Sequence, residues 1–150
     1  MAKPIKAFLD TSVLFAALLS ETGGSRLILK LGEAGALQLL LSRQILSEAE
    51  GALKRKAPDA MPLFSMLLER ARVEIVDTAP RKTVRRLQPA VGHAGDTQIA
   101  ADALVAKADY LITLDKAHLL ENSALAEAVP YAIGSPGEFI AWYRVHVGAD

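Results

Sequence analysis

The sequence predicts an α/β fold, in the form of one three-layer α/β/α domain with a mostly parallel central sheet. Strand-length apolar runs alternate along the chain with segments of helical spacing, which is the pattern of consecutive βαβ units. One of these runs, residues 36–41, is almost continuously apolar, as expected for a strand covered on both faces. The 150 residues contain no repeat, linker or low-complexity tract, so we expect a single domain over residues 1–150.

Each predicted strand is a short apolar run. Ile5 to Leu9 is expected to be buried, whereas Tyr131 to Ile133 is the weakest of the set. The predicted strands cover residues 5–9, 36–41, 73–76, 108–114 and 131–133. Because helical segments separate them, these strands are expected to form a parallel sheet.

The predicted helices are recognised by their start and stop signals. Thr11 or Ser12 would cap the first helix, Ser42 would cap a later one, and Pro136 occupies the first turn of the last. Pro89 is expected to close a basic helix. The predicted helices cover residues 13–19, 25–34, 43–56, 60–70, 80–87, 96–107 and 121–128, with a last helix from residue 136.

Composition narrows the classes of function. Seventeen basic residues balance seventeen acidic ones, so a nucleic-acid substrate would need a local basic patch rather than a global field. The chain has no cysteine, which excludes disulfides and thiolate zinc sites. No standard cleavage site follows the N-terminal apolar run, and no apolar run has the length of a membrane span. We therefore expect a cytoplasmic protein without a membrane partner.

Two predicted strands, far apart in the sequence, are followed by aspartates. Asp10 follows the first strand and precedes Thr11 and Ser12, and Asp115 follows the run that ends with Thr113 and Leu114. Ligands of open α/β folds bind at the carboxyl ends of the strands, so both carboxylates are placed where a site is expected. Taken alone, a helix cap explains Asp10, and a strand-ending turn explains Asp115, as well as a functional role does.

Further carboxylates lie on predicted helices. Asp96 falls in the middle of an apolar stripe formed by Ile99, Ala100, Ala103 and Leu104, and is therefore expected to face inward. Asp102 falls on the opposite side and is expected to be solvated. Glu48 and Glu50 flank the buried face of their helix on opposite sides, and helical periodicity does not choose between them.

A convergence of these carboxylates would be costly without a cation. Carboxylates a few ångströms apart raise each other's pKa, and a hard divalent cation relieves the repulsion. Oxygen ligands suit Mg²⁺ or Mn²⁺, and zinc is the poorer choice for this set of residues. A metal with open coordination positions deprotonates water and binds phosphate oxygens, so such a cluster indicates phosphodiester hydrolysis.

Four segments carry a resemblance to a known family. They are residues 10–13, residues 42–48, Asp96 with the alanines that follow it, and residues 108–115, and their order and spacing are more specific than any one of them. The chain resembles the PIN-domain nucleases over nearly its whole length. The Pro136-Gly137-Glu138-Phe139 segment is similar to the family's Pro-x-x-Phe ending. Within the family, the chain looks like the toxin component of bacterial toxin–antitoxin pairs, the VapC-like proteins.

The resemblance implies a function and a set of site residues. It implies an endoribonuclease that depends on Mg²⁺ or Mn²⁺, acts as a toxin, forms a homodimer and is neutralised by a small antitoxin. It also selects Glu48 over Glu50. The implied catalytic and metal-binding quartet is Asp10, Glu48, Asp96 and Asp115, and the implied polar neighbours are Thr11, Ser12 and Thr113.

One position departs from the family pattern. Relatives often carry another acidic residue shortly before the third carboxylate, where this chain has His93-Ala94-Gly95. The departure either weakens a second metal position or only reshapes the rim of the site. It also makes His93 a candidate phosphate contact. The other candidate RNA contacts are Arg26, Lys116 and His118. Two basic runs are further candidates, although a solvated face is their ordinary explanation: Lys54, Arg55 and Lys56, and Arg81, Lys82, Arg85 and Arg86.

Two alternative functions remain open on the sequence. A PIN-like pocket without activity would bind RNA or an antitoxin and cut nothing. The strand-end Asp10 also resembles the nucleophile of aspartate-dependent phosphatases, but those enzymes need a second aspartate where this chain has Ser12.

Overall fold

The central sheet has five parallel strands in the order β3-β2-β1-β4-β5. The structure is a computed structural model that describes residues 3–148. The strands are β1 (Ile5–Leu9), β2 (Leu37–Ser42), β3 (Glu74–Val76), β4 (Tyr110–Ile112) and β5 (Ala132–Gly134). Because β1 pairs with both β2 and β4, it lies at the centre and is covered on both faces.

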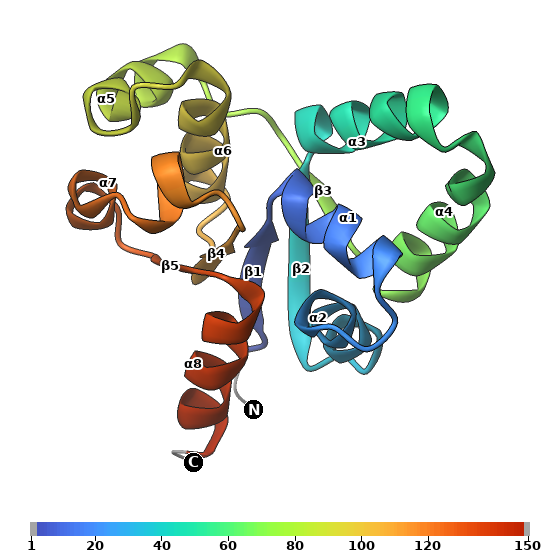
Figure 1. The fold of residues 1–150 in the computed structure, drawn as a ribbon. Helices are drawn as coiled ribbons and strands as arrows, with labels where there is room; N and C mark the ends of the chain where they lie inside the picture. The colour runs from blue at the N-terminus through green and yellow to red at the C-terminus, as the bar shows by residue number, and fades with distance from the viewer. Residues whose placement is uncertain (1–2, 149–150) are drawn as a thin grey trace.

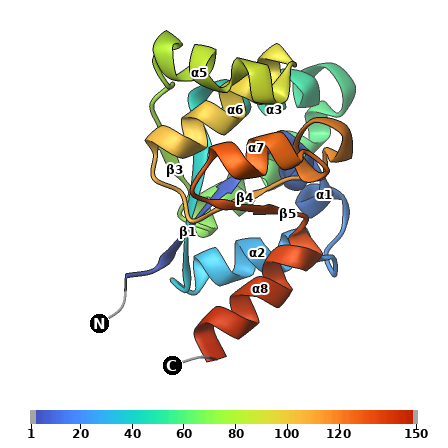
Figure 2. The same cartoon turned by 90° about the vertical axis from the view of Figure 1, so that its left-hand side faces the viewer.

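Helices cover both faces of the sheet. Contacts join α1 to α2 and α3, and join α5 to α6 and α7, and these two groups lie on opposite sides of the sheet (Figures 1 and 2). The chain runs from β1 through β2 to β3 in one direction across the sheet and from β3 through β4 to β5 in the other, and right-handed crossovers place the helices of the two directions on opposite faces. The helices are α1 (Thr11–Leu19), α2 (Gly24–Glu33), α3 (Arg43–Lys56), α4 (Met61–Arg70), α5 (Arg81–Val91), α6 (Ala94–Val105), α7 (Ser123–Ala128) and α8 (Pro136–Gly148). The predicted three-layer α/β/α fold is confirmed.

The core consists mainly of leucine, isoleucine and alanine from the central strands and the helices packed on them. Phe8 and Leu9 of β1 and Leu39 of β2 are fully buried. On the side of β5, Tyr110 packs edge-on against Phe139 of α8, with 4.9 Å between ring centroids. This packing fixes the strand ends, and the side chains that follow them, in place.

Three local predictions are wrong. The N-cap of α1 is Asp10 rather than Thr11 or Ser12. Pro89 lies inside α5, which continues to Val91 and is capped by Gly92 in a left-handed conformation with φ of 79°. Asp102 is fully buried rather than solvated, since the segment before α5 crosses it and the backbone N–H of Ala79 donates to its Oδ1 at 2.6 Å.

The element boundaries differ from prediction mainly at the fourth strand. Regular pairing in β4 covers residues 110–112, and the chain then enters a π-helical turn at Lys116–Leu120 that was not predicted. Within residues 3–148 no single helix has the length and apolarity to cross a membrane, although α1 and α2 together, bent by 97°, reach that length and composition.

Candidate active site

Asp10 lies at the carboxyl end of β1 and is 7% exposed. Its Oδ1 accepts a hydrogen bond from the backbone N–H of Thr11 at 2.7 Å, and its Oδ2 accepts from Ser12 Oγ at 3.2 Å and from Thr113 Oγ1 at 2.7 Å. Burial raises the pKa of the Asp10 carboxyl above its ordinary value, and these hydrogen bonds offset only part of the rise. The carboxylate is therefore held in one orientation.

Thr113 connects Asp10 to Asp115. The Thr113 hydroxyl is fully buried, donates to Asp10 and accepts from the backbone N–H of Asp115 at 3.0 Å. Ser12 makes a second link, because its Oγ accepts from the backbone N–H of Leu114 at 3.1 Å. The predicted polar neighbours Ser12 and Thr113 thus bind Asp10, whereas the buried Thr11 Oγ1 has no hydrogen-bond partner among the described residues.

Asp96 projects from the first turn of α6 toward Asp115. It is 8% exposed, so the prediction of an inward carboxylate is confirmed. Burial and the charge of Asp115 raise the pKa of Asp96 to about 6, and the charge of Asp10 adds to the rise. Burial also opposes ionisation of Asp115, but hydrogen bonds from the backbone N–H of His118 and from Asp96 outweigh it and lower the pKa of Asp115. The three aspartates therefore form one electrostatically coupled cluster.

Two histidines complete the cluster on its open side. The Nδ1 atoms of His93 and His118 lie 2.9 and 3.2 Å from Asp96 Oδ2, and the two rings stand 4.7 Å apart. His93 Nδ1 also lies 3.4 Å from the backbone N–H of Asp96. One ring nitrogen cannot both donate and accept. We therefore assign the 2.9 Å contact as the hydrogen bond, with the Nδ1–H of His93 donating to the Asp96 carboxylate.

A set of donor atoms suited to a metal results. A carboxylate oxygen of Asp96, one of Asp115 and a ring nitrogen of His118 all lie within 4.8 Å of one another. These donors fit a divalent cation, because a cation would relieve the repulsion that raises the pKa of Asp96. The sequence indicates His118 as a candidate RNA contact close to Asp115, and not as a metal ligand. The sequence did contain a signal for its place in the cluster, namely its spacing of three residues from Asp115. One helical turn brings a residue at that spacing back to the same side of the chain.

Glu48 stands apart from this cluster. It is exposed on α3, and its Oε1 accepts a hydrogen bond from Gln44 Nε2 at 3.1 Å. Among residues 3–148, no hydrogen bond or ion pair joins Glu48 to the three aspartates. Ser42, as predicted, caps α3 by accepting from the backbone N–H of Ile45 at 3.2 Å. The role of Glu48 stays a prediction.

The predicted RNA contacts other than His93 and His118 are less closely tied to the cluster. Arg26 links α2 to α1, since its Nε donates to the carbonyl of Ala17 at 2.8 Å. Lys116 is exposed in the π-helical turn directly after Asp115. The two basic runs are also exposed, which fits the explanation of solvated faces. Their members are Lys54, Arg55, Lys56, Arg81, Lys82, Arg85 and Arg86.

The family model described as PIN domain matches residues 6–117. The matched segment includes Asp10, Glu48, Asp96 and Asp115. No curated protein matches the chain in sequence.

Two crystal structures resemble the chain in fold. One is PAE2754 from Pyrobaculum aerophilum, with a TM-score of 0.64 and 17% identity over 94% of this chain and 90% of that one. The other is VapBC2 from Rickettsia felis bound to a DNA fragment from its promoter, with a TM-score of 0.64 and 18% identity over 87% of this chain and 98% of that one. At these identities the similarity establishes the fold. Since the family model covers well over half of its length, the chain belongs to the PIN-domain family.

Proposed function

We propose that this chain is a divalent-metal-dependent endoribonuclease and the toxin of a toxin–antitoxin pair. The observation that carries the proposal is the coupling of Asp10, Asp96 and Asp115 at the carboxyl edge of the sheet. Membership of the PIN-domain family supports a nuclease. A buried carboxylate cluster of this kind is suited to binding a cation that in turn binds phosphate.

Mg²⁺ or Mn²⁺ is the proposed cofactor. Asp10, Asp96 and Asp115 would hold it, directly or through water, and it would supply an activated water and neutralise charge on the phosphate. The His118 ring nitrogen lies among the same donors. Imidazole nitrogen suits Mn²⁺ better than Mg²⁺, so this donor set favours Mn²⁺. Glu48 is proposed to hold metal or to position the attacking water.

The residues around the cluster have positioning roles. Thr113 and Ser12 fix the orientation of the Asp10 carboxylate, and the backbone N–H of His118 fixes Asp115 at 3.1 Å. His93 is half-exposed beside Asp96 and is proposed to contact an RNA phosphate, with Lys116 and Arg26 as further contacts. These fixed groups would align a phosphodiester without rearrangement of the site.

The proposed partners are a small antitoxin and a second copy of the chain. VapBC2, a similar fold, is described as bound to promoter DNA, and an assembly of that kind is proposed here. An apolar groove of about 400 Å³ lies between α1, α3 and α4, and Phe15, Leu19 and Leu53 are among the residues that line it. Leu19 is 85% exposed. Exposed apolar surface of this kind fits a protein partner.

The test is cleavage of single-stranded RNA by the purified chain with Mn²⁺ or Mg²⁺, with EDTA as control. We expect cleavage with metal, none with EDTA, and none with Asp10→Asn. Asp59→Asn, a substitution of an exposed aspartate in a distant turn, should cleave normally. Cleavage that survives both EDTA and Asp10→Asn would overturn the mechanism, and RNA binding without cleavage under any metal would indicate a binding module.

Glu48 has its own matched control on the same helix. Glu48→Gln should lower the cleavage rate with Mn²⁺, because a charged metal or water ligand is removed. Glu50→Gln, two residues away and on the other flank of α3, should cleave like the unmodified chain. Equal rates for the two variants would exclude Glu48 from the site.

A further inference from the structure

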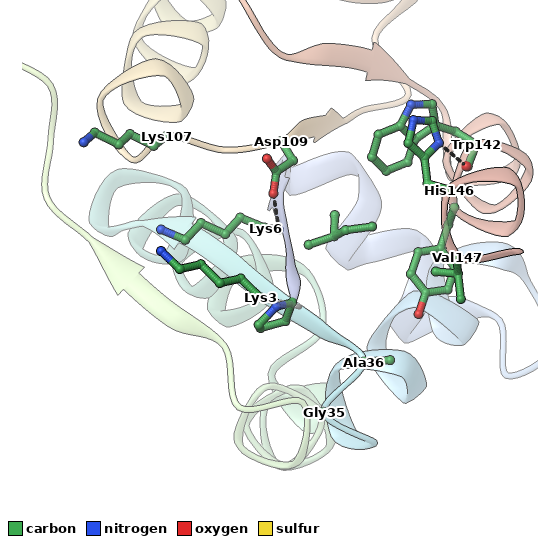
Figure 3. Close-up of a pocket in the computed structure, with 12 residues that line it drawn as sticks. Lys3, Lys6, Gly35, Ala36, Lys107, Asp109, Trp142, His146 and Val147 are labelled. Atoms are coloured by element: carbon green, nitrogen blue, oxygen red, sulfur yellow. Dashed lines mark hydrogen bonds between the residues drawn. The ribbon is translucent and has the colours of Figure 1, made fainter. Parts of the chain in front are cut away.

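A hollow of about 770 Å³ lies at the amino edge of the sheet, opposite the carboxylate cluster. It is lined by residues just before β1, β2 and β4 and by the last turns of α8 (Figure 3). We call it the amino-edge basin and define it by Lys3, Lys6, Lys107, Trp142, Tyr143 and His146. Ile5, which opens β1, lines the basin, whereas Asp10 follows the end of β1. The basin therefore lies about 16 Å, the length of a five-residue strand, from the cluster.

One side of the basin is basic. Lys3, Lys6 and Lys107 lie on the same side in Figure 3. Within residues 3–148, none of their ammonium groups makes an ion pair with a carboxylate. The nearby Asp109 is occupied, because its Oδ2 accepts from the backbone N–H of Lys6 at 2.8 Å. In a chain of zero net charge, three ammonium groups at one rim form a local anion-attracting field.

The other side of the basin is aromatic and rigid. The Trp142 ring is half-buried and stacks on His146, with 3.9 Å between centroids and 28° between planes. Tyr110 lies 5.0 Å from it on another side. The ring of His146 is itself fixed by a contact of 2.8 Å between its Nδ1 and the carbonyl oxygen of Trp142. Because His146 covers one face of Trp142 and is itself exposed, a flat ligand ring would extend this stack on His146 with little further loss of side-chain entropy.

We propose that the amino-edge basin binds a nucleoside phosphate, with the phosphate on Lys3, Lys6 and Lys107 and the base against Trp142 and His146. Figure 3 shows the side chains of Lys3, Lys6 and Lys107 on the side of the basin away from Trp142 and His146, so the ligand would cross the strand ends with its phosphate at one side and its base at the other. A basic side and an aromatic side in one hollow are the combination that holds single-stranded nucleic acid. The volume suits a ligand of nucleotide size. An acidic peptide would satisfy the lysines but leave the aromatic wall uncovered, so the nucleotide is the better fit. This binding is independent of cleavage at the other edge.

Trp142 is the sole tryptophan of the chain, so its fluorescence reports directly on the basin. The experiment titrates the full chain, in EDTA, with a single-stranded oligoadenylate, with AMP and with inorganic phosphate. We expect saturable quenching by oligoadenylate, by AMP or by both, and none by phosphate alone. Quenching by AMP alone identifies a free nucleotide as the ligand, and tighter binding of oligoadenylate identifies an RNA strand.

A double variant tests the basic rim against a matched control. Lys6→Gln with Lys107→Gln should weaken binding about ten-fold at low salt and reduce the slope of log affinity against log salt by about 0.7 for each lysine. Lys30→Gln with Arg70→Gln, at two exposed basic residues elsewhere, should change neither. Circular dichroism checks that all variants fold.

Several outcomes would overturn the proposal. They are the absence of saturable quenching, equal weakening in both double variants, and equal quenching by a glutamate decapeptide, which would assign the basin to an acidic segment. Asp10→Asn separates this proposal from the nuclease: the variant should lose cleavage and keep quenching. Quenching in a chain that never cleaves RNA would leave the basin established and the nuclease refuted.

Discussion

The two edges of the sheet have opposite chemistry, although β1 spans the distance between them with five residues. At the carboxyl edge, Asp10 and Asp96 are buried and held by hydrogen bonds and neighbouring rings. At the amino edge, Lys6 and Lys107 border an open basin. The carboxyl edge is thus organised for close coordination, whereas the amino edge is organised for looser contact with an anion.

Helix polarity explains why the charges separate in this way. In this fold α1 and α6 begin at the carboxyl edge, and the partial positive charge of a helix start stabilises carboxylates there. Helices end near the amino edge, where the partial negative charge favours lysine. A single helix, α6, shows both effects, because Asp96 lies in its first turn and Lys107 follows its end. The comparison therefore predicts that substitutions at one edge leave the other intact.

The largest expected effect is at Asp115. Asp115→Asn should lower single-turnover RNA cleavage with Mn²⁺ by about a hundred-fold or more, because a charged ligand of the metal is lost. The matched control is Asp109→Asn, which removes the charge of the aspartate at the opposite edge and should cleave normally. Trp142 quenching by oligoadenylate should persist in Asp115→Asn. Loss of cleavage in both variants would contradict the separation of the edges.

Thr113→Val should give the next largest effect. The change keeps the side-chain volume but removes the donor to Asp10 and the acceptor for the Asp115 backbone N–H. Loss of a group that orients metal ligands lowers metal affinity about 10- to 100-fold. Titration calorimetry with Mn²⁺ measures it, with Thr78→Val, at an exposed threonine, as control. An unchanged Mn²⁺ affinity would remove Thr113 from the positioning role.

A smaller and metal-dependent effect is expected at His118. His118→Gln removes a ring nitrogen from the donor set, so Mn²⁺ affinity should fall about ten-fold while Mg²⁺ affinity changes little. His146→Gln, at the amino edge, should leave both affinities unchanged but alter the Trp142 emission on which it stacks. Equal losses for the two metals would indicate a general distortion rather than a nitrogen ligand.

The sequence predicted those features that depend on local periodicity. The strand at residues 5–9, the Ser42 cap and the inward position of Asp96 follow from patterns within one element, and the structure confirms them. Asp102 was mispredicted because its cover comes from Ala79, a residue in a distant connection. The periodicity of a helix shows which of its residues share a face, but not which distant segment packs over them.

The site itself was only partly predictable for the same reason. Asp10 and Asp115 are placed by strand ends, which are visible in the sequence, but the two-sided role of Thr113 depends on the packing of β4 beside β1. The approach of His93 to His118 joins two elements that no periodicity connects. Glu48 and Glu50 cannot be separated by their own helix, and only the family resemblance chose between them.

The smallest expected effect concerns stability and pH, and it belongs to the carboxyl edge alone. Burial and the charge of Asp115 raise the pKa of Asp96 from its ordinary value of 3.8 to about 6. Between these two values the folded chain holds more protons at Asp96 than the unfolded chain does. The contribution of Asp96 to the free energy of unfolding therefore falls as the pH rises from about 4 to about 6, and is constant below that window.

Asp96→Asn isolates this contribution from the other carboxyls. In EDTA, urea unfolding at about pH 4 and about pH 6.5 should show a smaller loss of stability with rising pH in Asp96→Asn than in the unmodified chain. Lys107→Gln, at the other end of α6, should retain the full pH dependence, since it leaves Asp96 and its neighbours unchanged. If Asp96→Asn kept the full dependence, the proton taken up in this window would belong to another buried carboxyl, Asp10 or Asp102, whose pKa burial also raises. The double variant Asp96→Asn/Asp102→Asn would then separate these two possibilities. Loss of the pH dependence would assign it to Asp102, which accepts from Ala79 on the far side of α6, and its persistence would assign it to Asp10.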